Sequence, residues 1–383
     1  MKYIKFKDAT ISTQYGYTAT ETSQTEGQYK YLRITDIVPY YVNFETVPFC
    51  DIPEKQVQKY LVKEGDILIA RTGATTGYNY VVPKGIRNTV YASYLIRFVI
   101  DRTVVRPLFM KYVLKSQSYY GFVNNYIGGS AQPGMNAKVF GKFNIPRHSL
   151  ECQDKIASIL STYDTLIENN TKRVRLLEQM AENLYKEWFV RFRFPGHENV
   201  EMENGLPKGW KKGTLKDICE FKRGKNITAD EMSEGDVPVI SAGITPSGYH
   251  NQANVKGLSV TMSSSGANAG YISFHYSDIW AADCSFIDSR ATEYIYYAYE
   301  LLNNMRIVIN NFQRGAAQPH VYPKDINRIR LVIPEESLIA KANEHLKVIH
   351  DEIKNFQEQN TLLTRQRDLL LPRLMSGKLE VQP

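Results

Sequence analysis

Apolar residues follow two different patterns along this chain of 383 residues. Across residues 156–188 they recur at alternating steps of three and four without Gly or Pro, and residues 339–374 repeat this spacing. Such spacing predicts two coiled-coil seams, with Ser149 placed to cap the first helix. We expect Pro372 to end or kink the second helix near its last turn.

Each seam carries an asparagine at an equivalent position, Asn170 in the first and Asn360 in the second. A polar residue at a seam fixes register, because misaligned pairing would bury an amide without hydrogen bonds. We therefore predict that the helices pair antiparallel about a pseudo-twofold axis, with both asparagines near its centre. A locally shifted seam that leaves both amides in water is the alternative.

The remaining sequence consists of short segments that are rich in β-branched and aromatic residues and bounded by Gly, Asn, Asp or Pro. They predict strands at residues 29–38, 65–71, 93–100, 257–264 and 278–287. Helical turns are predicted at residues 106–125 and 293–312. The expected fold class is α+β, with two similar mixed α/β domains separated by two long helices that form an antiparallel coiled coil.

The chain also contains an internal duplication. Ile145 and Pro146 recur 188 residues later as Ile333 and Pro334. Further equivalent residues are Gly73 and Gly77 with Gly266 and Gly270, Gln132 and Lys138 with Gln318 and Lys324, and Asp8 with Asp217. The offset drifts between these anchors, as loop insertions would produce. The period is too long for a solenoid, so each repeat should be a domain with its own core.

Composition indicates a protein with ample material for more than one core, since 43% of its residues are hydrophobic and it has 26 Tyr and 16 Phe. Its four cysteines show no metal-binding spacing, and we expect reduced thiols or small core residues. No secretory signal or run of ~20 apolar residues occurs. We expect a cytoplasmic protein without a membrane partner.

The net charge of +7 is distributed unevenly. Residues 151–190 and 335–375 together hold 11 basic and 14 acidic side chains, which leaves 36 basic and 26 acidic side chains for the rest of the chain. This distribution is typical of globular domains that meet phosphate and helices that meet protein.

Polar loop residues beside the duplicated anchors are the candidate contacts to DNA. Arginine can bind guanine and Asn or Gln can bind adenine through paired hydrogen bonds, whereas Lys mostly contacts phosphate. The candidates are Arg71, Thr72, Thr75, Thr76, Asn79, Gln132, Asn136, Lys138, Ser263, Ser264, Asn268, His275, Gln313, Arg314, Gln318, His320 and Lys324. The same residue types also form turns and helix caps, so a purely structural role is the alternative at each position.

Motifs for catalysis and for metal binding are missing from the sequence. It lacks GxxxxGK[ST], HExxH, GxSxG and GxGxxG, and no Asn-Pro-Pro-aromatic tetrapeptide of amino-methyltransferases occurs. The seven histidines have no metal-ligand spacing. We predict a binding protein that is not an enzyme, with no catalytic and no metal-binding residues. The alternative is a nuclease or methyltransferase with a degenerate site.

Several segments resemble one known family. They are "GDILIARTGATTG", "DVPVISAG", "SAQPGMN" beside "AAQPHVY", the two "IPxxSL" sequences, "FRFPG" and "LLLPRLMSGKLEV". In this order and duplication they resemble the specificity subunit of type I restriction-modification systems, over essentially the whole chain. The resemblance implies two target recognition domains, each binding one half of an asymmetric bipartite DNA site, and a coiled coil that sets the gap between the half-sites.

The resemblance also implies domain boundaries and partners. The expected order is recognition domain 1 at 1–147, a spacer helix at 148–190, a linker at 191–208, recognition domain 2 at 209–334, a C-terminal spacer helix at 335–375 and a tail at 376–383. Partners would be double-stranded DNA, two modification (methyltransferase) subunits and, in the full complex, restriction subunits. This chain would hold no cofactor, and S-adenosylmethionine, ATP and Mg would be bound by partner subunits. A non-enzymatic coiled-coil scaffold that binds proteins instead of DNA is the alternative function.

Overall fold

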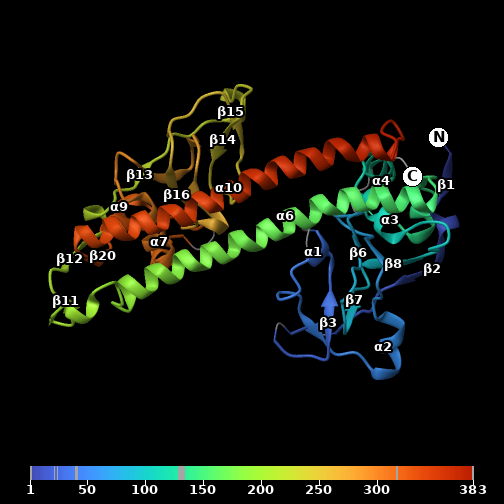
Figure 1. Ribbon diagram of the computed structural model, residues 1–383, viewed down its shortest axis with the longest axis horizontal. Coiled ribbons are helices and arrows are strands. Elements are labelled where there is room, and N and C mark those ends of the chain that lie inside the picture. Colours follow the sequence, from blue (N-terminus) through green and yellow to red (C-terminus); the bar gives the residue numbers. More distant parts are fainter. Residues whose placement is uncertain are drawn as a thin grey trace. The chain divides into compact units, whose positions relative to one another are not determined.

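The chain folds into two compact units, each of which includes parts of both long helices. The computed structural model describes residues 2–20, 22–23, 25–38, 42–127, 134–315 and 318–381. Unit 1 comprises residues 1–169 with 359–383, and unit 2 comprises residues 170–358. The division falls inside α6 (Leu150–Tyr185) and α10 (Glu336–Met375), which Figure 1 shows in green and red. No described helix is long and apolar enough to cross a lipid bilayer.

Unit 1 contains a four-stranded antiparallel sheet, a three-stranded mixed sheet and a two-stranded pair. In order of pairing these are β2 (Thr10–Tyr15), β8 (Leu95–Ile100), β5 (Ile67–Ala70) and β6 (Asn79–Val81); β4 (Phe49–Cys50), β3 (Tyr29–Leu32) and β7 (Thr89–Tyr91); and β1 (Tyr3–Lys5) with β9 (Asn144–Pro146). Its short helices are α1 (Ile34–Ile37), α2 (Glu54–Tyr60), α3 (Pro107–Val113), α4 (Gln117–Ile127) and α5 (Ala137–Phe140).

The main core of unit 1 joins the four-stranded sheet to the long helices. Ile67 and Phe98 from the sheet pack in one buried cluster with Phe109 of α3, Leu160 of α6 and Leu374 of α10. Helices α3 and α4 accordingly lie beside the start of α6 and the end of α10 (Figure 1). The helix segments are therefore part of the core of this unit.

Unit 2 repeats this arrangement with different strand lengths. Its sheets, in order of pairing, are β13 (Lys222–Arg223), β19 (Cys284–Asp288), β16 (Ser259–Ser263) and β17 (Ile272–His275); β15 (Gly248–His250), β14 (Val237–Ile240) and β18 (Trp280–Ala281); β12 (Lys211–Thr214) with β20 (Arg330–Ile333); and β10 (Met202–Glu203) with β11 (Leu206–Pro207). Helices α7 (Ile295–Asn304), α8 (Arg306–Asn310) and α9 (Pro323–Ile326) complete the unit. Val260, Tyr297, Tyr185 and Ala342 share its core, so α6 and α10 are again included.

Within each unit the two helix segments run in opposite directions. The contacts in unit 1 are His148 with Met375 (Nε2 to O, 3.3 Å) and Asp164 with Arg367 (2.9 Å). Those in unit 2 are Arg173 over the Phe356 ring (5.3 Å) and Trp188 with His345 (5.6 Å between ring centroids). In both units, later residues of one helix meet earlier residues of the other, as an antiparallel arrangement requires.

Several local predictions are confirmed. Strands occur within residues 65–71, 93–100 and 257–264. Ser149 accepts a hydrogen bond from the Cys152 backbone at 3.2 Å and thereby caps α6. Asn170 is buried and Asn360 is half-buried, which does not fit the alternative in which both amides face water.

One strand prediction needs correction. The strand predicted over residues 29–38 ends at Leu32, because the side chain of Asp36 accepts hydrogen bonds from Arg33 and starts α1 instead.

The segment predicted as a linker is largely exposed. Within it Phe194 is buried and stacks on Trp210, with 5.9 Å between the ring centroids. Pro372 lies in the last turn of α10, which ends at Met375.

Candidate nucleic-acid interface

Each unit contains one hairpin loop of the same backbone shape. The first loop joins β5 to β6, and the second joins β16 to β17. Gly73 and Gly77 have φ angles of +75° and +90°, and Gly266 and Gly270 have φ angles of +75° and +86°. Residues with a side chain rarely adopt these angles, which explains why glycine recurs at all four positions. Gly77 and Gly270 also donate equivalent backbone hydrogen bonds to the last residue of the preceding strand, at 2.8 and 2.9 Å.

A later segment of the sequence lies against each loop through the same backbone contact. The N–H of Met135 donates to the carbonyl of Arg71 at 2.8 Å, and the N–H of Val321 donates to the carbonyl of Ser264 at 3.0 Å. The anchors that are duplicated in the sequence are therefore neighbours in space. We call residues 71–79 with 134–138 the first loop pair, and residues 263–271 with 313–315 and 318–324 the second loop pair.

Arg71 is the most distinctive residue of the first loop pair. Its guanidinium carbon lies 4.9 Å from the centre of the Tyr15 ring, within the range of a cation–π interaction. Arg71, Thr72 and Thr75 are all half-buried. Their side chains remain candidates for contact with a ligand.

The second segment of the first loop pair contributes exposed polar side chains. Asn136 and Lys138 are both exposed. Asn136 also accepts a hydrogen bond from the backbone of Val139 at 3.0 Å and so caps α5. Lys138 therefore remains a candidate for contact with phosphate, whereas Asn136 already has a structural role. Gln132 lies outside the described residues.

Two predicted contact residues of the first unit are buried. Thr76 is 4% exposed and its hydroxyl donates to the carbonyl of Gly73 at 2.7 Å. Asn79 is 3% exposed and its amide donates to the carbonyl of Leu114 at 2.8 Å. Side chains that are enclosed in this way cannot reach a base edge, so we assign them to the packing of the hairpin.

Two predicted contact residues of the second unit are buried as well, and a third, His275, is half-buried. Ser263 and Ser264 are buried, and the Ser263 hydroxyl donates to the carbonyl of Ala242 at 2.9 Å. The ring of His275 is hydrogen-bonded to the hydroxyl of Thr261 at 2.8 Å. Burial lowers the pKa of His275 to about 4, so this histidine is neutral near pH 7. Ser263 and Ser264 are therefore enclosed, whereas the half-buried ring of His275 already has a hydrogen-bond partner.

The second loop pair nevertheless presents a polar rim. Its exposed residues are Gln313, Arg314, Gln318 and Lys324, and Asn268 and His320 are half-buried. Gln313 donates to the carbonyl of Ala269 at 2.8 Å, which ties the two segments of the loop pair together. Arg314 pairs with Asp325 at 2.8 Å, and this exposed ion pair costs little to exchange for a phosphate.

Sequence reasoning missed two exposed aromatic residues beside Arg71. Tyr15 is 41% exposed and Tyr94 is 60% exposed. Tyr94 accepts a backbone hydrogen bond from Arg71, and the pairing of β2 with β8 and of β8 with β5 brings Tyr15 to the same place. The sequence feature that could have pointed to Tyr15 is Gly16, which is equivalent to Gly224 in the duplication. Each of these glycines directly follows the end of its strand, β2 in unit 1 and β13 in unit 2.

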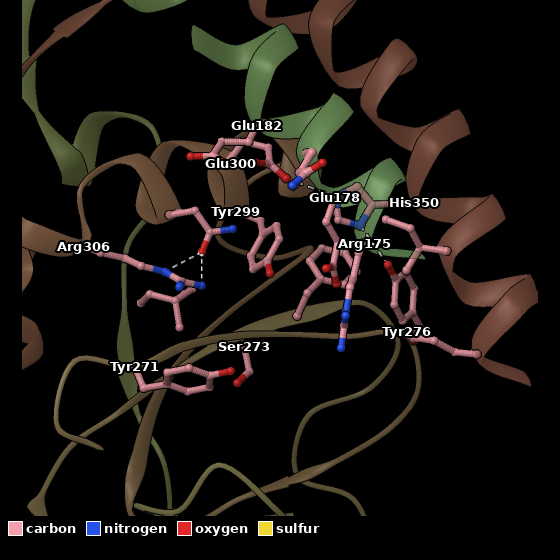
Figure 2. Close-up of a pocket in the computed structure, with 16 residues that line it drawn as sticks. Arg175, Glu178, Glu182, Tyr271, Ser273, Tyr276, Tyr299, Glu300, Arg306 and His350 are labelled. Atoms are coloured by element: carbon pink, nitrogen blue, oxygen red, sulfur yellow. Dashed lines mark hydrogen bonds and ion pairs between the residues drawn. The ribbon is translucent and has the colours of Figure 1, made fainter. Parts of the chain in front are cut away.

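A polar cavity of about 550 Å³ lies inside unit 2, between the long helices, β17 and α7 (Figure 2). Its deepest groups are Glu300 and His350, which are 4% and 2% exposed. The Tyr276 hydroxyl lies 2.9 Å from Nδ1 of His350, and Nε2 of His350 lies 3.5 Å from Glu300. Burial and then the charge of Glu300 raise the pKa of Glu178 at the cavity wall. The contacts of His350 tie α10 to the globular half.

The described residues offer no group of three or more His, Cys, Asp or Glu side chains that could hold a metal ion. The four cysteines are free, and three of them are buried. The candidate sites for ligand contact are the two loop pairs, whose rims carry Arg, Lys, Asn and Gln side chains.

Comparison with known proteins agrees with this duplication. The family model described as "Type I restriction modification DNA specificity domain" matches residues 14–179 and again residues 207–369. The chain belongs to this family and contains two of its domains.

Individual relatives extend over most of the chain. The "Type I restriction enzyme MjaIX specificity subunit" of Methanocaldococcus jannaschii is 27% identical over 362 residues, which cover 87% of this chain and 82% of that protein. The MjaVIII specificity subunit of the same organism is 26% identical over 238 residues, or 62% of this chain and 51% of that protein. A crystal structure of a type I restriction-modification S subunit from M. genitalium has the same fold, with a TM-score of 0.61, 18% identity and coverage of 97% and 95% of the two chains.

Proposed function

We propose that this chain is the DNA-specificity subunit of a type I restriction-modification complex. The observation that carries the proposal is that the loop pair occurs twice, with the same backbone hydrogen bonds and with different side chains at its rim. Two similar loop pairs with different rims suit an asymmetric site with two unlike half-sites. Membership in the specificity family favours DNA as the ligand over the alternative of a protein-binding scaffold.

The long helices would set the distance between the half-sites. Helix α6 has 36 residues and is therefore about 54 Å long at ~1.5 Å per residue. Successive major-groove faces on one side of DNA are ~34 Å apart, so a helix of this length can separate two contacts by more than one turn. In this proposal the seams with Asn170 and Asn360 form one antiparallel coiled coil.

A second row of apolar residues on the helices would receive the methyltransferase subunits. At steps of seven or fourteen residues, α6 exposes Ile159, Leu166 and Met180, and α10 exposes Val348, Leu362 and Leu369. Exposure of such a row to water is energetically unfavourable, and the row is typical of a helix that packs against another protein. S-adenosylmethionine, ATP and Mg would then be bound by the methyltransferase and restriction subunits, and this chain would perform no catalytic step.

An electrophoretic mobility shift with purified methyltransferase subunits tests DNA selection directly. We expect the complex to retain a DNA fragment that contains the methylated site of the source genome and to release it as salt rises, since phosphate contacts release counterions. The chain without its partners should show no methyl transfer from S-adenosylmethionine. Equal binding to all sequences at every salt concentration would contradict the proposal.

The docking row can be tested separately. Leu362→Glu and Leu369→Glu should prevent co-purification with the methyltransferase subunits without altering the thermal unfolding of the chain. Leu379→Glu is the matched control, because Leu379 is also exposed but lies outside α10. Loss of assembly in the control alone would place the docking surface elsewhere.

A further inference from the structure

Each loop pair is also hydrogen-bonded to neighbouring strands of its unit. We call a loop pair together with these strands a frame, and the side chains of the two frames can be compared position by position. In unit 1 the N–H of Arg71 donates to the carbonyl of Tyr94 at 3.0 Å. In unit 2 the N–H of Ser264 donates to the carbonyl of Asp283 at 3.4 Å. Ser264 is thus the counterpart of Arg71, and Asp283 is the counterpart of Tyr94.

The neighbouring strand gives the third position. The N–H of Gly16 donates to the carbonyl of Leu95 at 3.1 Å, and the N–H of Gly224 donates to the carbonyl of Cys284 at 2.8 Å. The residue before each glycine is therefore equivalent, which makes Arg223 the counterpart of Tyr15. One backbone frame carries Tyr, Arg and Tyr in unit 1 and Arg, Ser and Asp in unit 2.

The electrostatic environment of the arginine differs between the frames. In unit 2 the guanidinium of Arg223 pairs with the carboxylate of Asp283 at 2.7 Å, which neutralises its charge and occupies part of its donor edge. In unit 1 no carboxylate of the described residues pairs with Arg71, and its guanidinium lies over the Tyr15 ring. A ring below the guanidinium fixes its plane but leaves the N–H edge free.

We propose that Arg71 recognises a guanine in the half-site that unit 1 contacts, with Tyr15 as the support that holds its guanidinium in place. Guanine presents two acceptors, O6 and N7, on its major-groove edge, and their spacing fits two N–H donors of one guanidinium. Tyr94 borders the same position through its backbone, since its carbonyl accepts from the N–H of Arg71 at 3.0 Å. The second frame lacks an unpaired arginine, so unit 2 does not recognise guanine in this way. This inference rests on the proposed function.

Methylation mapping with the assembled complex tests the inference. Wild-type and variant chains are combined with the methyltransferase subunits, and methylated adenines are located by long-read sequencing of a DNA library that contains randomised half-sites. Arg71→Ala should reduce the preference for one guanine by between about fivefold and 150-fold, because a bidentate contact contributes ~1–3 kcal/mol of discrimination. The preferences of the other half-site should be unchanged.

Four variants separate base recognition from general affinity. Arg71→Lys keeps the charge but loses the paired donors, so it should retain affinity and still lose the preference for guanine. Tyr15→Leu should weaken the same preference, whereas Tyr15→Phe keeps the ring and should retain it. Lys138→Ala should weaken binding to all sequences equally and reduce the steepness of its salt dependence.

The outcomes also separate this inference from the proposed function. If Arg71→Ala and Arg71→Lys both keep the wild-type site preference, Arg71 is not a recognition residue, although the chain can still be a specificity subunit. If the wild-type complex methylates adenines without regard to sequence, the proposed function itself is wrong. A normal melting temperature of the Arg71→Lys variant excludes misfolding as the cause of a lost preference.

Discussion

Replacing Asp164 by alanine should destabilise unit 1 far more than replacing an exposed carboxylate on α6. One carboxylate oxygen of Asp164 accepts from Lys111 at 2.6 Å and from Tyr112 at 2.8 Å, and the other accepts from Arg367 of α10 at 2.9 Å. The side chain is only 5% exposed. It therefore joins both long helices to α3 in a region from which water is largely excluded.

The magnitude follows from the groups that the substitution would leave behind. Removal of one partner of a buried ion pair costs about 3–5 kcal/mol, because the remaining charge stays desolvated. Arg367 retains a contact with the exposed Asp368 at 2.9 Å, so we expect the lower end of this range. For a unit of this size, each kcal/mol lowers the melting temperature by about 2–4 °C, which gives a loss of about 6–12 °C.

Asp154→Ala is a matched control on the same helix. Asp154 also pairs with an arginine, Arg106, at 3.1 Å, but its side chain is 54% exposed. Exposed pairs contribute up to about 1 kcal/mol.

All three tryptophans, Trp188, Trp210 and Trp280, belong to unit 2. The assay can therefore resolve the two units. Far-UV circular dichroism follows the unfolding of the whole chain, and tryptophan fluorescence follows unit 2 alone. We expect Asp164→Ala to move the circular dichroism transition to lower temperature, with a smaller effect on the fluorescence transition. The reasoning fails if Asp164→Ala lowers the melting temperature no more than Asp154→Ala does.

Three further substitutions test the remaining assignments. Glu178→Gln should raise the melting temperature at pH 8 but not at pH 4. Burial and the charge of Glu300 raise the pKa of Glu178, so its ionised form lowers the stability of the folded chain as pH rises through that pKa. Equal gains in melting temperature at both pH values would contradict this prediction. His275→Gln should reduce the loss of stability that the chain undergoes between about pH 6.5 and pH 4. The pKa of His275 is about 4 in the folded chain, so protonation favours the unfolded chain by up to about 3 kcal/mol. Urea unfolding at pH 7 and pH 4 measures this difference in the free energy of unfolding. Asn79→Ala should cost about 1–3 kcal/mol by leaving the Leu114 carbonyl unsatisfied, and unchanged DNA affinity in the assembled complex would support a packing role.

Long-range order in the sequence predicts much of the fold. The repeated spacing of apolar residues locates both long helices, because a helix of ten turns averages out local exceptions. The glycine positions of the duplicated loops are predictable for a similar reason, since their backbone angles exclude most other residues.

The side-chain environment of each loop residue was not predictable in the same way. Thr72 and Thr76 are both threonines of one loop, yet Thr72 is half-buried and Thr76 is buried. The difference depends on how the turn rotates each side chain toward or away from its own unit. Tyr15 escaped notice because it reaches Arg71 through strand pairing across 56 positions of sequence, a relation that local patterns do not contain.

The main-chain hydrogen bonds that hold each loop pair together have a consequence for how such a protein can change in sequence. The hydrogen bonds at Gly77 and Met135 use main-chain atoms on both sides, and their counterparts at Gly270 and Val321 do the same. Apart from Gln313, whose side chain donates to the Ala269 carbonyl, substitution of a rim residue therefore leaves these contacts intact, and the scaffold tolerates new surface chemistry at little cost in stability. Under the proposed function, a lineage that carries these loop pairs would acquire new target sequences by a few point mutations, while its fold would stay the same.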